Sequence, residues 1–227
     1  MKELAIYCAG GFGREVYGLI FNKIIPALQE GSIKENANDI DADTRFVGFF
    51  DDGIEKGTKL QYGTCLGGMD DLNAWQTPLY VVIANGSPKM LKHISESVYN
   101  NNVSFPNIVH PFVTYTDFST LQLGKGNLII YGCRFSVNVQ IGDFNVFNSD
   151  DTFGHETIVG NCNAFMPGVR VSGGVTIGNE NLFGANSFIY QGLKVGNNVH
   201  LSPGSIMITK PKDGGTYIGN PATRLKY

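Results

Sequence analysis

Three glycines near the start of the chain, Gly10, Gly11 and Gly13, follow an apolar segment and precede a helical pattern. Glycine lets the backbone approach a ligand closely, and the free N–H groups at a helix start favour a phosphate. The spacing is not a clean GxGxxG motif, because Arg14, two residues before Val16, is not a glycine. The segment therefore predicts either a phosphate-binding loop or a plain tight turn. Its candidate ligand-binding residues are Gly10, Gly11, Phe12 and Gly13.

Two consecutive aspartates, Asp51 and Asp52, follow the next apolar segment, residues 46–50. Carboxylates at the carboxyl end of a parallel strand can accept hydrogen bonds from ribose hydroxyls or from a uracil ring. Aspartate is also a common helix cap and turn former. The place of the pair at a strand end favours nucleotide binding.

Strand and helix patterns alternate around these residues. Strands are predicted at 3–9, 46–50 and 79–84, and helices at 14–25 and 88–100. A strand, a glycine-rich turn, a helix and another strand form the βαβ unit typical of nucleotide-binding domains. The polar stretch 29–45 is predicted as an extended loop. We expect an α/β, Rossmann-like domain over residues 1–106.

An internal repeat with a period of six residues occupies the rest of the chain. Every sixth position from Leu123 to Met207 is large and apolar. These positions are Leu123, Ile129, Phe135, Ile141, Phe147, Phe153, Val159, Phe165, Val171, Ile177, Phe183, Ile189, Val195, Leu201 and Met207. The chance of such a run is on the order of one in a million, so the period is a structural signal.

Each six-residue unit is expected to form a short strand and a turn, and three units close a coil of about 18 residues. The apolar residue points inward, and a small or β-branched residue two positions earlier packs near the corner. Such residues include Cys133, Val139, Thr157, Val169, Val175, Ser187 and Val199. Glycine and asparagine suit the left-handed backbone of the corners. We predict a left-handed parallel β-helix of hexapeptide repeats over residues 107–227, with close to five coils at 123–207.

Composition narrows the function classes. Glycine is abundant, with 29 of 227 residues, and the net charge is −3, so no excess of positive charge favours a nucleic acid. No apolar run approaches the roughly 18 residues of a membrane span, and the amino-terminal segment does not fit a signal peptide. The four cysteines have no CxxC spacing, which favours reduced thiols in a cytoplasmic protein.

Both halves together resemble one family. The motifs are Gly-Gly-Phe-Gly-Arg-Glu-Val at 10–16, Gly-Phe-Phe-Asp-Asp at 48–52 and Ile-Gly-Asn-Pro-Ala at 218–222. With the hexapeptide repeat, they are similar to the bacterial sugar acetyltransferases that include sialic-acid O-acetyltransferase and the UDP-amino-sugar N-acetyltransferase of bacillosamine synthesis. The resemblance implies a nucleotide sugar bound by the first domain, a homotrimer of the β-helix, and acetyl-CoA between neighbouring β-helices.

The family's catalytic histidine lies in a Gly-His-Glu segment, which here is Gly154, His155 and Glu156. The resemblance implies that His155 acts as general base, taking the proton of an amine or hydroxyl that attacks the thioester. An imidazole with a pKa of about 6.5 suits this task near neutral pH. Glu156 would fix the imidazole tautomer and stabilise the imidazolium. The alternative is an ordinary surface histidine on a turn.

Further site residues follow from the same resemblance. Asn148 matches a family asparagine near the acceptor amine, and Gly173 matches a glycine at the acetyl group, where its N–H would stabilise the oxyanion. The residues expected to contact acetyl-CoA are Gly173, Ala185, Gly192, Ile218 and Pro221. No metal is implied.

The sequence departs from the family at two places. Several members carry a second histidine nine residues after the catalytic one, where Ala164 stands here. The polar stretch 29–45 can reshape the nucleotide-sugar pocket. Both departures leave the identity of the acceptor sugar open. The first hypothesis is N-acetylation of a UDP-linked amino sugar for surface glycan synthesis. The alternatives are O-acetylation of a sialic-acid-like or capsular sugar, and a non-catalytic trimer that binds a nucleotide sugar.

Overall fold

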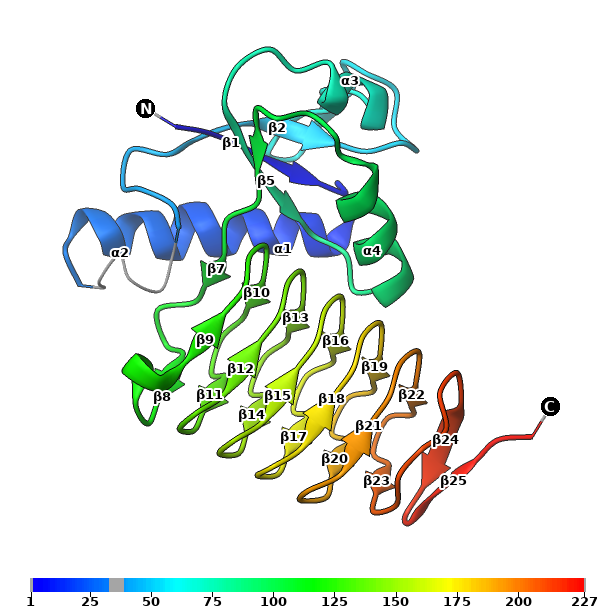
Figure 1. Ribbon diagram of the computed structural model, residues 1–227. Helices are drawn as coiled ribbons and strands as arrows, with labels where there is room; N and C mark the ends of the chain where they lie inside the picture. The colour runs from blue at the N-terminus through cyan, green and yellow to red at the C-terminus, as the bar shows by residue number, and fades with distance from the viewer. Residues whose placement is uncertain (1, 33–38, 227) are drawn as a thin grey trace. The chain divides into compact units, whose positions relative to one another are not determined.

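The computed structural model describes residues 2–32 and 39–226 (Figure 1). Contacts within the chain divide it into two compact units. The first is Met1–Gly86 with Met90–Pro111, and the second is Phe112–Tyr227 with Ser87–Lys89. Residues 33–38, part of the predicted polar loop, lie outside the described residues.

The first unit contains a four-stranded parallel sheet in the order β2-β1-β5-β6. Its strands are β1 (Glu3–Tyr7), β2 (Arg45–Phe50), β5 (Leu79–Ile83) and β6 (Val103–Ser104). Parallel strands covered on both faces are near-continuous apolar runs, and Leu4, Ala5 and Ile6 are fully buried. The predicted Rossmann-like βαβ unit is confirmed. Strand β1 ends before the predicted Ala9, because Cys8 turns the backbone with a φ of 78°.

One long helical segment follows the glycine turn. It consists of α1 (Gly11–Leu19), the π-helical turn η1 (Ile20–Ile24) and α2 (Ile25–Gln29). The predicted helix, 14–25, is too short at both ends, because the glycines at 10, 11 and 13 favour a turn and a proline, here Pro26, usually ends a helix. Pro26 instead lies in the first turn of α2, where a proline is tolerated.

The other elements of the first unit are short. They are the hairpin strands β3 (Lys59–Leu60) and β4 (Gly63–Thr64), helix α3 (Met69–Asn73) and strand β7 (Ile108–Val109). Helix α4 (Pro88–Ser97) ends before the predicted residue 100. The sequence pattern did not predict β3, β4 or α3, because each is too short to show a hydrophobic period.

The second unit is a left-handed parallel β-helix built from three sheets, as predicted. The first face carries β8 (Thr114–Tyr115), β11 (Arg134–Phe135), β14 (Thr152–Phe153), β17 (Arg170–Val171), β20 (Phe188–Ile189) and β23 (Ile206–Met207). The second carries β9 (Gln122–Leu123), β12 (Gln140–Ile141), β15 (Ile158–Val159), β18 (Thr176–Ile177) and β21 (Lys194–Val195). The third carries β10 (Leu128–Ile129), β13 (Val146–Phe147), β16 (Ala164–Phe165), β19 (Leu182–Phe183), β22 (His200–Leu201), β24 (Thr216–Gly219) and β25 (Ala222–Arg224). A 3-10 turn, η3, spans Phe118–Thr120. Strands β8 and β24 extend the coils beyond the repeat seen in the sequence.

The six-residue period sets the core of this unit. Leu123 is half-buried, and each later position of the period is at most 5% exposed. Phenylalanines stack from coil to coil, with ring centroids 5.1 Å apart for Phe147 and Phe165 and 4.8 Å apart for Phe165 and Phe183. The predicted inward direction of the repeat is therefore confirmed.

A ladder of buried asparagines runs along one corner inside the β-helix. Asn127, Asn145, Asn163 and Asn181 are fully buried and are spaced 18 residues apart. The side-chain amides of Asn145, Asn163 and Asn181 each donate to the side-chain oxygen of the asparagine one coil before, over 2.9 to 3.1 Å. The same amides also donate to glycine carbonyls of the next coil. The interior therefore contains a hydrogen-bonded polar column, which the apolar period did not reveal.

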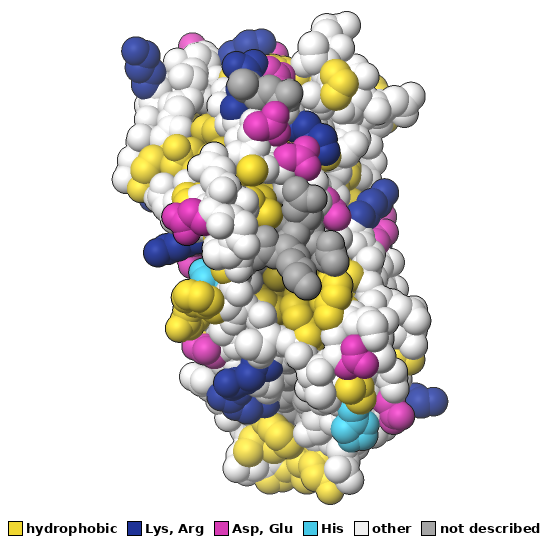
Figure 2. Space-filling model, turned by 90° about the vertical axis from the view of Figure 1, so that its left-hand side faces the viewer, with side chains coloured by type: hydrophobic (Ala, Val, Ile, Leu, Met, Phe, Trp, Pro, Cys, Tyr) yellow, Lys and Arg dark blue, Asp and Glu magenta, His cyan; other side chains and the backbone are white. Residues whose placement is uncertain are grey.

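None of the four cysteines forms a disulfide, and Cys65, Cys133 and Cys162 are buried. Among the described residues, no helix is long and apolar enough to cross a membrane. Figure 2 shows Lys and Arg side chains interspersed with Asp and Glu on one face, without a broad area of positive charge.

Candidate active site

The predicted acetyl-transfer residues lie on two corners that border the first face of the β-helix. Corner A comprises the turns that enter its strands, residues 130–133, 148–151, 166–169, 184–187 and 202–205. Corner B comprises the turns that leave them, residues 136–139, 154–157, 172–175 and 190–193. Turns at one corner stack at 18-residue intervals, because the strands on either side pair in that register.

His155 and Glu156 lie in the corner B turn that follows β14. The imidazole Nδ1 is 3.5 Å from a Glu156 carboxylate oxygen, an ion-pair distance that is longer than a normal hydrogen bond. Both side chains are largely exposed, at 63% and 67%. The carboxylate thus faces Nδ1, which leaves Nε2 as the nitrogen that can take a proton from a substrate.

The His155 ring lies against the backbone of Gly173, one coil later. A β-carbon built at Gly173 would be 2.5 Å from Nε2 and 2.8 Å from Cε1, distances that real side chains do not adopt. Gly174 donates its N–H to the His155 carbonyl over 2.8 Å. Within residues 2–32 and 39–226, no backbone carbonyl accepts the Gly173 N–H. The structure therefore brings together His155, Glu156 and Gly173.

Glu156 has a left-handed backbone, with a φ of 58°. At the same place in neighbouring turns stand Asn138, Gly174 and Gly192, with φ between 56° and 70°. Glycine and asparagine suit this conformation, whereas glutamate has no intrinsic preference for it. Phe144, Cys162 and Glu180 adopt the same backbone at another corner, so this conformation is a property of the turns, and at Glu156 it places a carboxylate beside His155.

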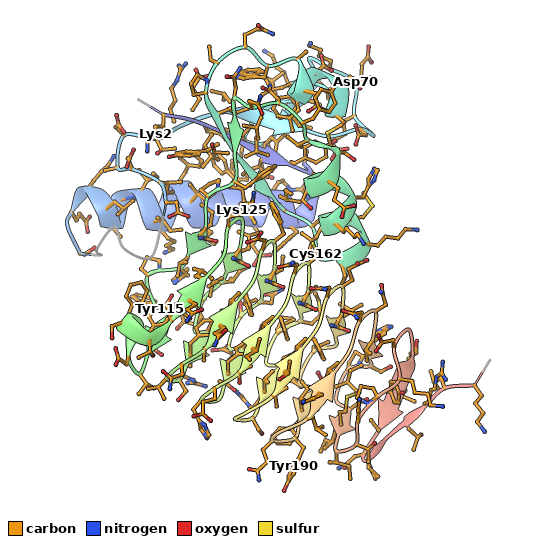
Figure 3. The ribbon with its side chains drawn as sticks, in the orientation of Figure 1. Lys2, Asp70, Tyr115, Lys125, Cys162 and Tyr190 are labelled. Carbon is orange, nitrogen blue, oxygen red and sulfur yellow. The ribbon has the colours of Figure 1, made fainter. Side chains whose placement is uncertain are left out.

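The predicted acetyl-CoA residues are divided between the corners. Gly192 lies in corner B, two turns from His155, and a β-carbon there would meet open space. Tyr190, labelled in Figure 3, projects from the same corner. Ala185 lies in corner A, and Ile218 and Pro221 lie in the β24–β25 hairpin.

The hairpin belongs to the corner A side of the β-helix. Gly219 donates its N–H to the hydroxyl of Ser205, a corner A residue, over 3.0 Å. Asn148 also lies in corner A, where its side-chain oxygen accepts the Ser149 N–H over 2.8 Å. The strand β14 separates Asn148 from His155. Within one chain, therefore, the structure does not bring Asn148, Ala185, Ile218 and Pro221 to the His155 turn.

The glycines of the first unit have different surroundings. A β-carbon on Gly13 would overlap the Cys8 carbonyl, so this glycine allows α1 to pack against the end of β1. Gly10 and Gly11 have no other atom within 4 Å of such a β-carbon. Gly10 caps α1 with extended backbone. The open backbone at Gly10 and Gly11 is thus the part of the turn available to a ligand, and Phe12 follows it in α1.

Asp51 and Asp52 hold the loops at the carboxyl edge of the sheet. Asp51 accepts the N–H of Ala9 over 2.8 Å and that of Gly53 over 2.9 Å. Asp52 accepts the Tyr7 hydroxyl over 2.6 Å and the N–H of Met69, at the start of α3, over 2.8 Å. Both aspartates therefore act as turn formers and caps, the alternative that the sequence left open, and each oxygen retains a lone pair for a ligand.

Asn85 is a residue of this edge that the sequence analysis did not single out. It follows β5, and its amide donates to the Cys8 Sγ over 3.4 Å. Burial raises the pKa of the Cys8 thiol, so this sulfur stays protonated near neutral pH. The signal available in the sequence was the position of Asn85, directly after a buried strand at the same edge as Asp51.

A cavity of about 480 Å³ lies at the opposite, amino-terminal edge of this sheet. Its lining includes Lys2, Arg45 and Tyr80. Lys2, labelled in Figure 3, is bonded to the Tyr80 hydroxyl and to Asp41, and these contacts raise its pKa. Arg45 is paired with Glu3. The cations of this cavity are thus already neutralised by the protein.

The remaining histidines belong to other elements than the His155 turn. His93 is in α4, and His200 is exposed on β22. His110 is buried, which lowers its pKa. Ala164, at the place of the family's second histidine, is fully buried in β16. No cluster of three potential metal ligands occurs in residues 2–32 and 39–226.

No family model matches the sequence, and no curated protein does either. Solved structures do match. The acetyltransferase domain of PglB from Neisseria gonorrhoeae FA1090 has a TM-score of 0.81 and 23% identity, over 99% of this chain and 100% of that one. PerB from Caulobacter crescentus has a TM-score of 0.79 and 18% identity, over 100% and 98%. The chain has the fold of these proteins.

A third structure, WeeI from Acinetobacter baumannii AYE, has a TM-score of 0.82 and 22% identity, over 99% of this chain and 100% of that one. The PglB domain has also been solved with acetyl coenzyme A, and PerB with CoA and GDP-perosamine. Both units of this chain are therefore present in each of these structures, which match along their whole length.

Proposed function

We propose that this protein is an acetyl-CoA-dependent N-acetyltransferase acting on a nucleotide-linked amino sugar, with UDP as the nucleotide expected first. The observation that carries the proposal is the His155 turn, where Nδ1 faces Glu156 and the ring lies over a bare glycine. This is the arrangement of a general base with its orienting carboxylate. An ordinary surface histidine needs neither a carboxylate facing Nδ1 nor a bare glycine beneath its ring.

The chemistry follows from these groups. The substrate amine attacks the thioester carbonyl carbon, and Nε2 of His155 takes the proton that the amine loses. The Glu156 carboxylate stabilises the imidazolium that forms. The N–H of Gly173 is free to donate to the developing oxyanion. Collapse of the intermediate breaks the carbon–sulfur bond and releases the CoA thiolate. The thiolate then takes the proton from the His155 imidazolium.

The division of site residues between two corners supports a homotrimer. If corner A of one β-helix packs beside corner B of the next, Asn148, Ala185 and the β24–β25 hairpin meet His155 and Gly173 of the neighbour. Closed cyclic assemblies repeat such a contact at every interface. The acetyl-CoA would then lie between adjacent β-helices, and its acetyl group would reach the His155 turn.

The carboxyl edge of the first unit supports nucleotide-sugar binding. The open glycines at the start of α1 suit the diphosphate, while Asp51 and Asp52 suit the ribose or base. Perosamine N-acetyltransferase, which shares the fold, has been solved with a GDP-linked amino sugar, which supports an amine acceptor. We place this activity in surface glycan synthesis in the cytoplasm, where four cysteines without disulfides stay reduced.

The test measures thiol release from acetyl-CoA with UDP- and GDP-linked amino sugars and with their hydroxyl-only counterparts. His155→Ala is compared with His200→Ala, which removes an exposed histidine from β22. We expect release only with an amino sugar, a loss of about 100-fold in His155→Ala, and no change in His200→Ala. Release confined to hydroxyl acceptors would point to O-acetylation, and no release with any acceptor to a binding protein.

A further inference from the structure

The turn that carries His155 has a hydroxyl at its last position, where the neighbouring corner B turns have an aliphatic side chain. At the equivalent place in successive coils stand Leu121, Val139, Thr157, Val175 and Leu193. Val139, Thr157 and Val175 are all fully buried. Threonine and valine share the same branched shape, so the packing of this corner alone does not require a hydroxyl.

The Thr157 hydroxyl closes this turn. Its Oγ1 donates to the Gly154 carbonyl over 2.8 Å and lies 3.4 Å from the Ser172 carbonyl of the next coil. In the part of the chain that the structure describes, no backbone N–H donates to the Gly154 carbonyl. In corner A, by contrast, the N–H of Ser187 closes the turn that starts at Gly184. No such backbone bond closes the adjacent corner B turns 136–139 and 172–175 in the described residues either, so the Thr157 hydroxyl gives the His155 turn a closing bond that those turns do not have.

The Gly154 carbonyl belongs to the peptide plane that leads into His155. Because a peptide is planar, fixing the carbonyl also fixes the direction of the His155 N–H and limits that of its side chain. The ring is largely exposed and has protein beneath it at Gly173, so its placement depends on the turn. The geometry points to Thr157 as a positioning residue that holds the His155 imidazole over Gly173. This inference rests on the proposed function.

The experiment compares Thr157→Val, which has the side chain of the adjacent coils, with Thr157→Ser, which keeps the hydroxyl. Val175→Thr, one coil away, is the matched control. We expect Thr157→Val to lower kcat about 10-fold, with KM for both substrates within about twofold, because a small misplacement of the base affects the reaction more than binding. Thr157→Ser and Val175→Thr should keep the wild-type kcat.

A second readout needs no substrate. The imidazole Cε1–Hε1 signal of His155, assigned by its loss in His155→Ala, should shift or broaden in Thr157→Val and stay in place in Thr157→Ser. An unmoved signal in Thr157→Val overturns the inference, whether or not kcat falls. If the wild type transfers no acetyl group, the proposed function fails, and the His155 signal alone decides the role of Thr157.

Discussion

The imidazole of His155 fills the space that a side chain on Gly173 would occupy. The two residues are one coil apart, and the Gly174 N–H binds the His155 carbonyl, so the stacking of coils fixes their contact. A catalytic base on an exposed turn is otherwise free to rotate. In this chain, the absence of a β-carbon at Gly173 lets the ring lie against the backbone and leaves Nε2 at the edge of this contact.

Gly173→Ala is therefore expected to displace the His155 ring. The backbone at Gly173 is not in the left-handed region, so an alanine causes no strain of its own. We expect kcat to fall about 100-fold, the loss associated with a misplaced group of about 1 Å. Steady-state kinetics check this, with Ser172→Ala, on the preceding residue, as the control. A Gly173→Ala enzyme with wild-type kcat would contradict the role of Gly173 in placing the His155 ring.

Replacing Glu156 by glycine is predicted to raise the stability of the protein and to lower its activity. Glu156→Gly relieves a left-handed backbone that disfavours glutamate by about 1 kcal/mol, which corresponds to a rise in Tm of about 2 to 4 °C. The same change removes the carboxylate beside Nδ1 and should lower kcat about 10-fold. Calorimetry and kinetics on one preparation measure both. Asn138→Gly, at the equivalent place one coil earlier, should give neither effect, because asparagine already suits this backbone.

Asp151 is expected to make stability depend on pH. It is fully buried, its Oδ1 accepts the Val169 N–H over 2.8 Å, and Oδ2 has no partner among the described residues. Burial raises its pKa well above the usual range. The folded state thus favours the neutral acid more than the unfolded chain does, so the contribution of Asp151 to stability declines as the pH rises above about 4.

Asp151→Asn removes this ionisation and keeps the Val169 bond. Its free energy of unfolding at pH 7 should exceed that of the wild type by roughly 1 kcal/mol or more, and the gain should vanish near pH 4. Urea unfolding between pH 4 and pH 8 measures the difference. Asp70→Asn, which changes an exposed aspartate of α3, is the control and should leave the pH dependence unchanged. A constant gain at every pH would rule out ionisation as its cause.

Gly11 and Gly13 of the first unit should respond differently to replacement by alanine. Gly13→Ala places a β-carbon into the Cys8 carbonyl and is expected to lower the stability of the first unit by about 1 kcal/mol or more. Gly11→Ala meets open space and should leave Tm nearly unchanged while weakening nucleotide-sugar binding. Thermal unfolding and titration calorimetry with the nucleotide sugar separate the two. Equal affinity in Gly11→Ala and the wild type would place the ligand elsewhere.

The sequence predicted the β-helix well, because a strict period of six leaves one choice for the side that faces inward. It did not predict the asparagine ladder, since asparagine gives no apolar signal and the ladder joins residues 18 positions apart, which become neighbours only when the coils stack. The prediction of the His155 turn depended on a resemblance to a family. The contact of its ring with Gly173 is visible only in the structure, because the two residues lie in successive coils. The helix at 11–29 was underestimated because glycine and Pro26 usually mark ends of helices.

The asparagine ladder also restricts how such a chain can change its length. A deletion of six residues would keep apolar side chains inward, but it would place a valine or an aspartate opposite an asparagine and leave buried amides unpaired. Only the removal or addition of 18 residues, the spacing of the ladder, keeps every rung intact. Tolerated insertions and deletions inside the β-helix should therefore come in whole coils, and each would move the His155 turn along the axis by one fixed step.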